Sequence, residues 1–163
     1  MFKVGEKVVY TINGVCEFSH IEKRMMGAKE FEYYVLKPVH NTNATVFVPS
    51  AQAHLVKRIK PLLSKKEAEA LVTRLSEAEE NWIANDSLRL AENKKIITEG
   101  DRFLIGLIIK SSYLHKARQL EKGKKLHLAD ERLLAEAEKA LIEELSLVTE
   151  TEKEAVLDKI LGK

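Results

Sequence analysis

Short apolar runs separated by turn residues fill the first 60 positions of the chain. The runs are rich in Val, Ile, Tyr and Phe, which favour strands, and turn signals lie at 26–29 and 40–43. The pattern predicts five strands, near residues 6–11, 14–24, 30–37, 44–48 and 54–58. Strands this short bury apolar surface only by closing on themselves or by packing face to face. We therefore expect a small SH3-like or Tudor-like β-barrel.

Beyond Lys60-Pro61 the apolar spacing changes to the 3.6-residue period of helices. We expect five helices, near residues 65–77, 86–98, 102–122 and 129–147, with a short last one ending near 161. The fold class is therefore α+β. A β module at 1–60 is followed by an all-α helical domain at 61–163.

Capping residues support these helix limits. The expected caps are the capping boxes Ser64/Glu67 and Thr149/Glu152, the N-caps in Asn85-Asp86-Ser87 and at Asp101, and the helix end at Gly123.

The third helix is expected to bury one face, made by Phe103, Leu104, Leu107, Ile108, Ser111 and Leu114. The fourth is expected to bury Leu134, Ala137, Leu141, Leu145 and Val148.

Charge limits the kind of partner. The 163 residues hold 27 Lys and Arg against 25 Asp and Glu, a net charge of +2. That balance excludes a protein that grips nucleic acid by charge alone. Residues 1–60 hold 9 basic and 5 acidic side chains, net +4, whereas residues 61–163 hold 18 and 20, net −2. The two halves can serve different partners, although ordinary scatter in surface charge explains the numbers equally well.

The single cysteine, Cys16, excludes an intramolecular disulfide and fits a reducing cytosol. Its place in an expected strand favours a small buried side chain over a nucleophile. The sequence has no apolar run near the ~18 residues of a spanning helix, and its N-terminus has no apolar signal core. We therefore expect a cytoplasmic protein.

Catalytic and metal-binding signatures are absent from the sequence. The five histidines are not paired at metal-ligand spacing, and the seven glycines form no phosphate-binding loop. The carboxylates cluster in runs typical of solvated helix surfaces, such as 77–80. We therefore expect a binding protein with no metal or cofactor, not an enzyme.

The only tryptophan, Trp82, lies between two polar, cap-like flanks, at an expected junction between helices. Three uses fit such an indole: it plugs the corner between helices, binds a protein partner, or presents a flat apolar wedge to nucleobases. Arg89, Lys94 and Lys95 follow on the next helix, where they could meet phosphates. Interleaved acidic residues also fit an ordinary mixed-charge surface there.

Several motifs resemble one family of bacterial transcription regulators. The opening 2–10 (FKVGEKVVY), with 32–37 (EYYVLK) and 46–49 (VFVP), resembles the N-terminal module of the CarD family and the RNA-polymerase-interacting domain of transcription-repair coupling factors. The helical half resembles the CarD C-terminal domain at Asn81-Trp82, Gly100-Asp101, 123–126 (GKKL) and 143–145 (EEL). The likeness covers essentially the whole chain.

This resemblance implies a regulator that binds the RNA polymerase β subunit, in part by pairing an edge strand, and that contacts promoter DNA at the upstream edge of the transcription bubble. The family tryptophan, matched by Trp82, wedges into the minor groove and stabilises the open complex. An indole at the fork is expected to stack on bases that have lost partners. The implied DNA-contacting residues are Trp82, Asn81, Arg89, Lys94 and Lys95.

In the β module, Arg24 matches a basic position at the polymerase interface. The segment matching the edge that meets the β subunit consists of Thr45, Val46, Phe47 and Val48. Phe47 stands where some members have Arg, so it either makes an apolar contact or belongs to the core.

The alternative function is an SH3/KOW-like RNA- or ribosome-binding adaptor. A monomer is expected, and the direction of regulation is left open.

Overall fold

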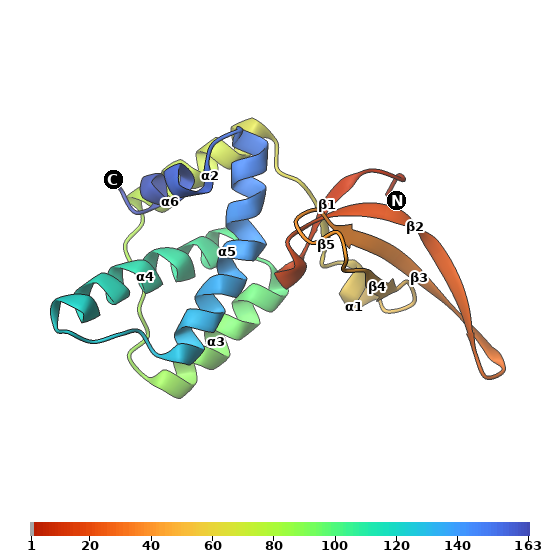
Figure 1. The fold of residues 1–163 in the computed structure, drawn as a ribbon, viewed down its shortest axis with the longest axis horizontal. Helices are drawn as coiled ribbons and strands as arrows, with labels where there is room; N and C mark the ends of the chain where they lie inside the picture. Colours follow the sequence, from red (N-terminus) through yellow and green to blue (C-terminus); the bar gives the residue numbers. More distant parts are fainter. Residues whose placement is uncertain (1) are drawn as a thin grey trace. The chain divides into compact units, whose positions relative to one another are not determined.

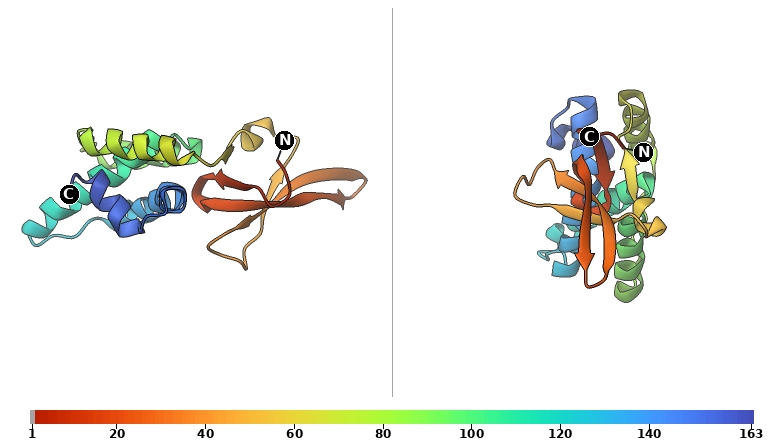
Figure 2. Two further views of the ribbon diagram at one scale, coloured as in Figure 1. Left: turned by 90° about the horizontal axis from the view of Figure 1, so that it is seen from above. Right: turned by 90° about the vertical axis from the view of Figure 1, so that its right-hand side faces the viewer.

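The computed structural model describes residues 2–163, apart from the side chain of Ile12. The chain divides into two compact units: the first ends at Leu62 and the second begins at Leu63. Figures 1 and 2 show a first unit built on a sheet and a second built only of helices. The expected α+β class, a small Tudor-like β domain followed by a helical domain, is confirmed.

Five antiparallel strands form the sheet of the first unit: β1 Lys7–Tyr10, β2 Val15–Met26, β3 Lys29–Pro38, β4 Val46–Pro49 and β5 Ile59–Pro61. Their order across the sheet is β4-β3-β2-β1-β5, so β4 and β5 are its two ends. A 3₁₀ turn, η1 Thr11–Asn13, joins β1 to β2. The inward-facing side chains form one core, in which Cys16 is fully buried as expected.

The fifth strand lies later than the sequence pattern predicts. Residues 54–58 were expected to be extended, but α1 Ala53–Val56 is a one-turn helix, and the strand that pairs with β1 is Ile59–Pro61. Leu55 and Val56 still pack against the core, from the helix instead of from a strand. A short apolar run serves either conformation equally well, which explains the error.

The β2–β3 hairpin is much longer than the other strand pairings. Its register runs from Cys16↔Pro38 to Met26↔Lys29, with an irregularity between Phe18 and His20. Figure 2 shows the hairpin extending beyond the rest of the sheet. Gly27 closes it with φ 66°, a conformation that disfavours other residues. The far half is solvent-exposed on both faces.

The second unit consists of α2 Lys65–Glu77, α3 Asp86–Glu99, α4 Arg102–Glu121, α5 Leu128–Thr149 and α6 Lys153–Ile160. All five expected helices are confirmed, with limits that agree within about two residues. Their apolar faces meet in a single core drawn from all five helices. Within residues 2–163, none of the helices has both the length and the apolar character needed to cross a membrane.

Local capping explains why these helix limits could be predicted. The Ser64 hydroxyl accepts from the Glu67 amide at 3.1 Å, and the Glu67 carboxylate accepts from the Ser64 amide at 3.0 Å. The carbonyl oxygen of the Asn85 side chain and the carboxylate of Asp101 cap α3 and α4 in the same way. The expected second capping box is wrong: the Thr149 hydroxyl donates back to Leu145 O, and Glu152 makes no side-chain cap bond.

The expected apolar face of α4 is only partly correct. Leu104, placed on that face, is 39% exposed, whereas Ile105 and Ile109 are buried. The reason is that α4 contacts α2, α3 and α5, so it is covered around most of its circumference. Gly106 allows this: a Cβ there would lie 2.4 Å from the Leu75 side chain on α2. On α5 the expected inward residues are confirmed as buried or partly buried core residues.

Candidate functional site

The segment 78–85 joins α2 to α3 and carries Trp82. Its first residues are held by Lys110, a buried lysine of α4. The Lys110 ammonium donates to three carbonyl oxygens at the end of α2, those of Leu75 at 2.8 Å, Ser76 at 3.0 Å and Ala78 at 2.7 Å. The last carbonyls of a helix lack the i+4 amide that would otherwise bond them, although Leu75 O also accepts from the Ala78 amide at 3.3 Å. Lys110 therefore stabilises the end of α2 and fixes where the segment starts.

The middle of segment 78–85 is held by the next turns of α4. The Asn81 amide donates to the Ser111 hydroxyl at 2.7 Å. The Arg118 guanidinium makes a two-pronged ion pair with Glu80, at 2.7 and 2.9 Å. Ser111, His115 and Arg118 are four and three residues apart, so they lie on one face of α4. That face holds the two residues immediately before Trp82.

Planar groups cover the Trp82 ring, which is half-buried. The His115 imidazole stacks on it with ring centroids 3.8 Å apart and planes 9° from parallel. The Arg89 guanidinium lies with its Cζ 4.2 Å from the ring centroid. Two such groups centred this close to one ring would overlap on a single face, so they lie on opposite faces. We call Trp82, Arg89 and His115 the indole clamp; it leaves only the edge of the indole for a partner.

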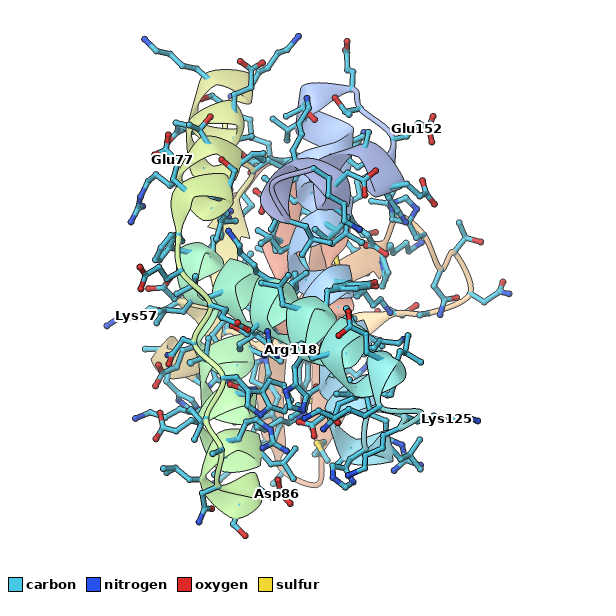
Figure 3. All side chains as sticks on the ribbon, turned by 90° about the vertical axis from the view of Figure 1, so that its left-hand side faces the viewer. Lys57, Glu77, Asp86, Arg118, Lys125 and Glu152 are labelled. Atoms are coloured by element: carbon cyan, nitrogen blue, oxygen red, sulfur yellow. The ribbon has the colours of Figure 1, made fainter. Side chains whose placement is uncertain are left out.

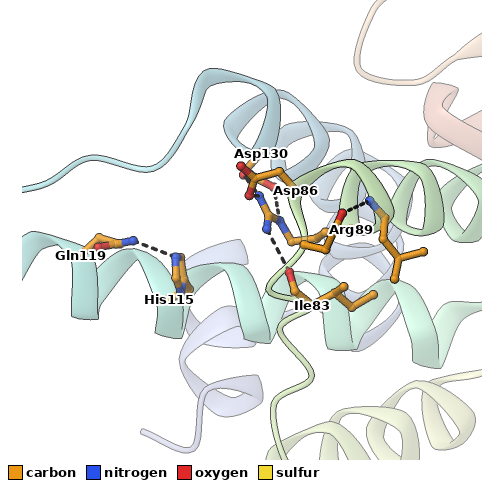
Figure 4. Close-up of polar contacts among 8 residues, drawn as sticks. Ile83, Asp86, Arg89, His115, Gln119 and Asp130 are labelled. Atoms are coloured by element: carbon orange, nitrogen blue, oxygen red, sulfur yellow. Dashed lines mark hydrogen bonds and ion pairs between the residues drawn. The ribbon is translucent and has the colours of Figure 1, made fainter.

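Arg89 is fixed by a buried ion pair. Its Nε donates to Asp130 Oδ1 at 2.9 Å and its Nη2 to Asp130 Oδ2 at 2.7 Å, while Nη1 donates to Ile83 O at 2.9 Å. Figure 4 shows the guanidinium between Asp130 and Ile83. Hydrogen bonding to Asp130 raises the pKa of Arg89 above its ordinary value, against the opposing effect of burial. The guanidinium is therefore a charged, immobile platform for the indole.

The expectation that Arg89 meets a DNA phosphate does not fit this geometry. Its side chain is 3% exposed and also pairs with Asp86 at 2.9 Å. A phosphate would have to displace carboxylates that already satisfy the guanidinium. Arg89 is a support beneath Trp82, and we do not carry it forward as a phosphate contact.

The other three expected DNA-contacting residues are exposed. Asn81 lies in segment 78–85, next to Trp82. Lys94 and Lys95 lie on the middle turns of α3, and the Lys94 ammonium pairs with Glu136 of α5 at 3.0 Å. An exposed pair of this kind is weak and is easily exchanged for a phosphate. The structure thus brings Asn81 to the clamp and puts the two lysines further along α3.

A basic group that the sequence reasoning did not select follows α4. Lys122, Lys124 and Lys125 are exposed in the turn after the helix, and Lys122 lies one turn beyond Arg118. Figure 3 shows Lys125 projecting outward, away from the helices. The run Lys122-Gly123-Lys124-Lys125 was visible in the sequence, but it was used only for the expected helix end at Gly123 and for the motif 123–126 of the resemblance. We call these three residues the basic turn.

His115 is held as a neutral imidazole. Burial lowers its pKa most, and the positive charges of Arg118 and Arg89 lower it further. The Gln119 amide nitrogen lies 3.0 Å from His115 Nε2, an arrangement in which Nε2 accepts (Figure 4). A neutral ring stacks on the indole without adding a positive charge beside two arginines.

The first unit carries a separate candidate site at its edge strand β4, which pairs with β3. Side chains alternate along it: Val48 is buried in the core and Val46 packs against it, whereas Phe47 points outward and is 38% exposed. The alternative that Phe47 belongs to the core is therefore wrong. Thr45 lies one residue before the strand begins.

The structure brings Arg24 and Phe47 together, although they lie on different strands. The Arg24 guanidinium stands 4.3 Å over the Phe47 ring, and Tyr33 packs edge-on against the same ring at 6.1 Å. Arg24 also pairs with Glu22. We call Arg24, Tyr33 and Phe47 the outer patch. It combines exposed aromatic surface and a cation beside an edge strand, a combination suited to a protein partner.

These observations define a class: a two-unit binding protein, with a β unit that offers an edge strand and a helical unit that presents a clamped tryptophan. Among residues 2–163, His, Cys, Asp and Glu side chains form no group of three or more that could hold a metal ion.

Comparison with family models agrees with this division. The CarD-like/TRCF RID domain matches residues 2–60, and the CarD C-terminal domain matches residues 69–161. The chain belongs to the CarD family, which comprises transcription regulators that interact with RNA polymerase and is not an enzyme family. The resemblance noted from the sequence is confirmed.

Proposed function

We propose that this protein binds the β subunit of RNA polymerase through its first unit and stabilises the promoter open complex through its second. In this proposal Trp82 wedges into the minor groove at the upstream edge of the transcription bubble. The observation that carries it is the indole clamp, which fixes a half-buried indole, with both faces covered, on a segment held by α4.

The position of β4 at one end of the sheet supports a polymerase contact by strand addition. The outer side of β4 offers main-chain groups to a partner strand, and the outer patch adds Phe47 and Arg24 beside it. Phe47 would supply an apolar contact at a position where, by the resemblance, some members of the family have Arg. Both family matches favour this partner over the alternative of an RNA- or ribosome-binding adaptor.

The clamp changes how the wedge acts. Stacking of bases on the indole, the expectation from sequence, requires a vacant ring face, and both faces are covered by protein groups. The edge of the ring is what can enter the minor groove, where apolar wedges separate base steps. Because the indole is already held between two packed groups, little conformational entropy remains to be lost when it meets DNA.

The basic turn supplies the phosphate contacts in this proposal, in place of Arg89. Lys122, Lys124 and Lys125 are exposed and follow the helix that supports Trp82, and exposed lysines serve phosphates as point charges. Lys94 and Lys95 are kept as secondary contacts. The polymerase delivers the protein to DNA, so few charges suffice.

Open-complex lifetime after challenge with a competitor tests the wedge. Trp82→Ala is expected to shorten it about fivefold for each ~1 kcal/mol of lost contact, with polymerase binding unchanged. Phe103→Ala is the matched control: it removes an aromatic ring that also lies under an arginine, Arg74 at 4.2 Å, but is remote from segment 78–85 in sequence and packs on the core. Equal lifetimes with Trp82→Ala and wild-type protein would refute the wedge.

Pull-down of the β subunit tests the other contact. Arg24→Glu and Phe47→Ala are expected to weaken binding, because both remove parts of the outer patch. Lys23→Glu is the control: it makes the same change of charge on the neighbouring residue, whose side chain points to the other face of β2 and pairs with Glu30. If Lys23→Glu weakens binding as much as Arg24→Glu, the outer patch is not the contact.

A further inference from the structure

His115 occupies a position from which it can control the pose of Trp82. Its ring lies 3.8 Å from the indole, nearly parallel to it, and comes from α4, while Arg89 comes from α3. Two helices therefore meet through one aromatic ring. Removing either covering group would leave the indole a free face and room to rotate.

We propose that His115 is a positioning residue: in its neutral form it presses the Trp82 indole against the Arg89 guanidinium and so keeps the ring edge pointing outward. The inference rests on the proposed function, because an outward edge matters only if Trp82 meets a partner. It assigns His115 no contact with DNA or polymerase.

The charges around His115 explain why the neutral form is required. Arg118 lies on the same helix, Arg89 faces it from α3, Asp130 from α5 and Glu80 from segment 78–85. The carboxylates are already engaged, Asp130 with Arg89 and Glu80 with Arg118. Burial opposes a charge on His115 most, and a proton there would also add a third cation beside Arg118 and Arg89, which Asp86 pairs with as well. The clamp would therefore loosen as the pH falls.

Gln119 completes the arrangement on α4, one turn after His115. Its amide nitrogen at 3.0 Å leaves Nε2 as the acceptor and the proton on Nδ1 (Figure 4). Protonation of His115 Nε2 would place its N–H directly against the N–H of the Gln119 side chain, and the hydrogen bond would be lost. The hydrogen bond and the charges thus favour the same protonation state.

The fluorescence of Trp82 measures the clamp directly, since the chain has no other tryptophan. In the full-length protein, His115→Ala is expected to increase quenching by acrylamide, and His115→Phe to restore protection because a flat apolar ring can stack in its place. His127→Ala, at an exposed histidine before α5, is the matched control and is expected to change nothing. Unchanged quenching in His115→Ala would overturn the proposal.

A pH profile separates positioning from simple packing. The emission of the wild-type protein is expected to change with a midpoint below the ordinary histidine pKa of about 6.5, and His115→Phe is expected to abolish that change. A change that persists in His115→Phe would overturn the requirement for a neutral imidazole.

Open-complex lifetime then tests the link to function. His115→Ala is expected to shorten it by about two- to tenfold, the loss of one aromatic contact, and His115→Phe to retain it and to make it independent of pH. A wild-type lifetime in His115→Ala, at a promoter where Trp82→Ala shortens it, would overturn the positioning role. If Trp82→Ala itself has no effect, the proposed function fails, while the quenching result still decides whether His115 holds the indole.

Discussion

The ion pair between Arg89 and Asp130 is buried within the helical unit, and it predicts a large effect of one neutralising substitution. The two side chains are 3% and 2% exposed and share two hydrogen bonds, at 2.9 and 2.7 Å. Asp130→Asn keeps the shape of the site but removes the charge. The Arg89 guanidinium would then remain buried with only the exposed carboxylate of Asp86 to compensate it.

The expected loss follows from the cost of an uncompensated buried charge. Breaking such a pair by removing one partner costs about 3–5 kcal/mol. Asp86 and the Ile83 carbonyl remain in contact with Arg89, so we expect the lower end, about 3 kcal/mol. For a unit of roughly 100 residues this corresponds to a fall in Tm of about 12–24 °C. Trp82 is the only tryptophan of the chain and belongs to the helical unit. Urea unfolding followed by tryptophan fluorescence therefore reports the stability of that unit.

Asp86→Asn is the matched control, because it removes the partner of Arg89 that is 66% exposed. An exposed pair contributes about 0–1 kcal/mol, so its effect is expected to be small. If Asp130→Asn destabilises the unit no more than Asp86→Asn does, the reasoning from burial is refuted.

The double variant Arg89→Met/Asp130→Leu separates stability from function. Apolar replacement of a complete buried pair is often neutral or stabilising, so the unfolding midpoint is expected to recover. The indole would nevertheless lack its guanidinium platform. The lifetime of the open complex is therefore expected to stay short, and recovery of both properties would contradict a role for Arg89 beneath Trp82.

Three further predictions concern packing, capping and pH. Gly106→Ala is expected to cost about 1–3 kcal/mol of stability, since its Cβ would overlap the Leu75 side chain; thermal unfolding measures it. Ser64→Ala is expected to cost about 1 kcal/mol through loss of the α2 capping box, measured by urea unfolding. Because the pKa of His115 is lower in the folded state, the unfolded state binds more protons below about pH 6.5. Stability is expected to fall as the pH drops through that value, and less so in His115→Phe, as measured by unfolding midpoints between pH 7.5 and 5.5.

The helix limits could be predicted because their causes are local in the sequence. Ser64 and Glu67 are three residues apart, and Asn85 and Asp101 cap the helices that follow them immediately. The segment expected to be a strand at 54–58 lacked such a cue, because its few apolar residues fit a strand or a helical turn. Which strand lies beside β1 is decided by tertiary pairing, and the sequence pattern carries no sign of it.

The clamp could not be predicted, because its partners are distant along the chain. Trp82 was recognised as unusual from its polar flanks. Its contact with His115, 33 positions later, and the pairing of Arg89 with Asp130, 41 positions later, have no sequence signal in a single chain. An arginine on an amphipathic helix is usually solvated, so a phosphate contact was the natural but wrong expectation for Arg89. Lys122, Lys124 and Lys125 surround the expected helix end at Gly123, and nothing local in the sequence distinguishes them from other surface lysines.

In the proposed function, the clamp and the net charge together explain how a weakly charged protein acts on DNA. With 18 basic and 20 acidic residues, positions 61–163 gain little from the release of counterions. Affinity must then come from the polymerase, and the helical unit needs only to present one apolar edge in a fixed pose. Two of its arginines are engaged in contacts that hold Trp82 or its segment, Arg89 against the indole and the exposed Arg118 against Glu80. In the proposed function these charges hold Trp82 in one pose instead of binding phosphates, so the wedge loses little conformational entropy when it meets the open bubble.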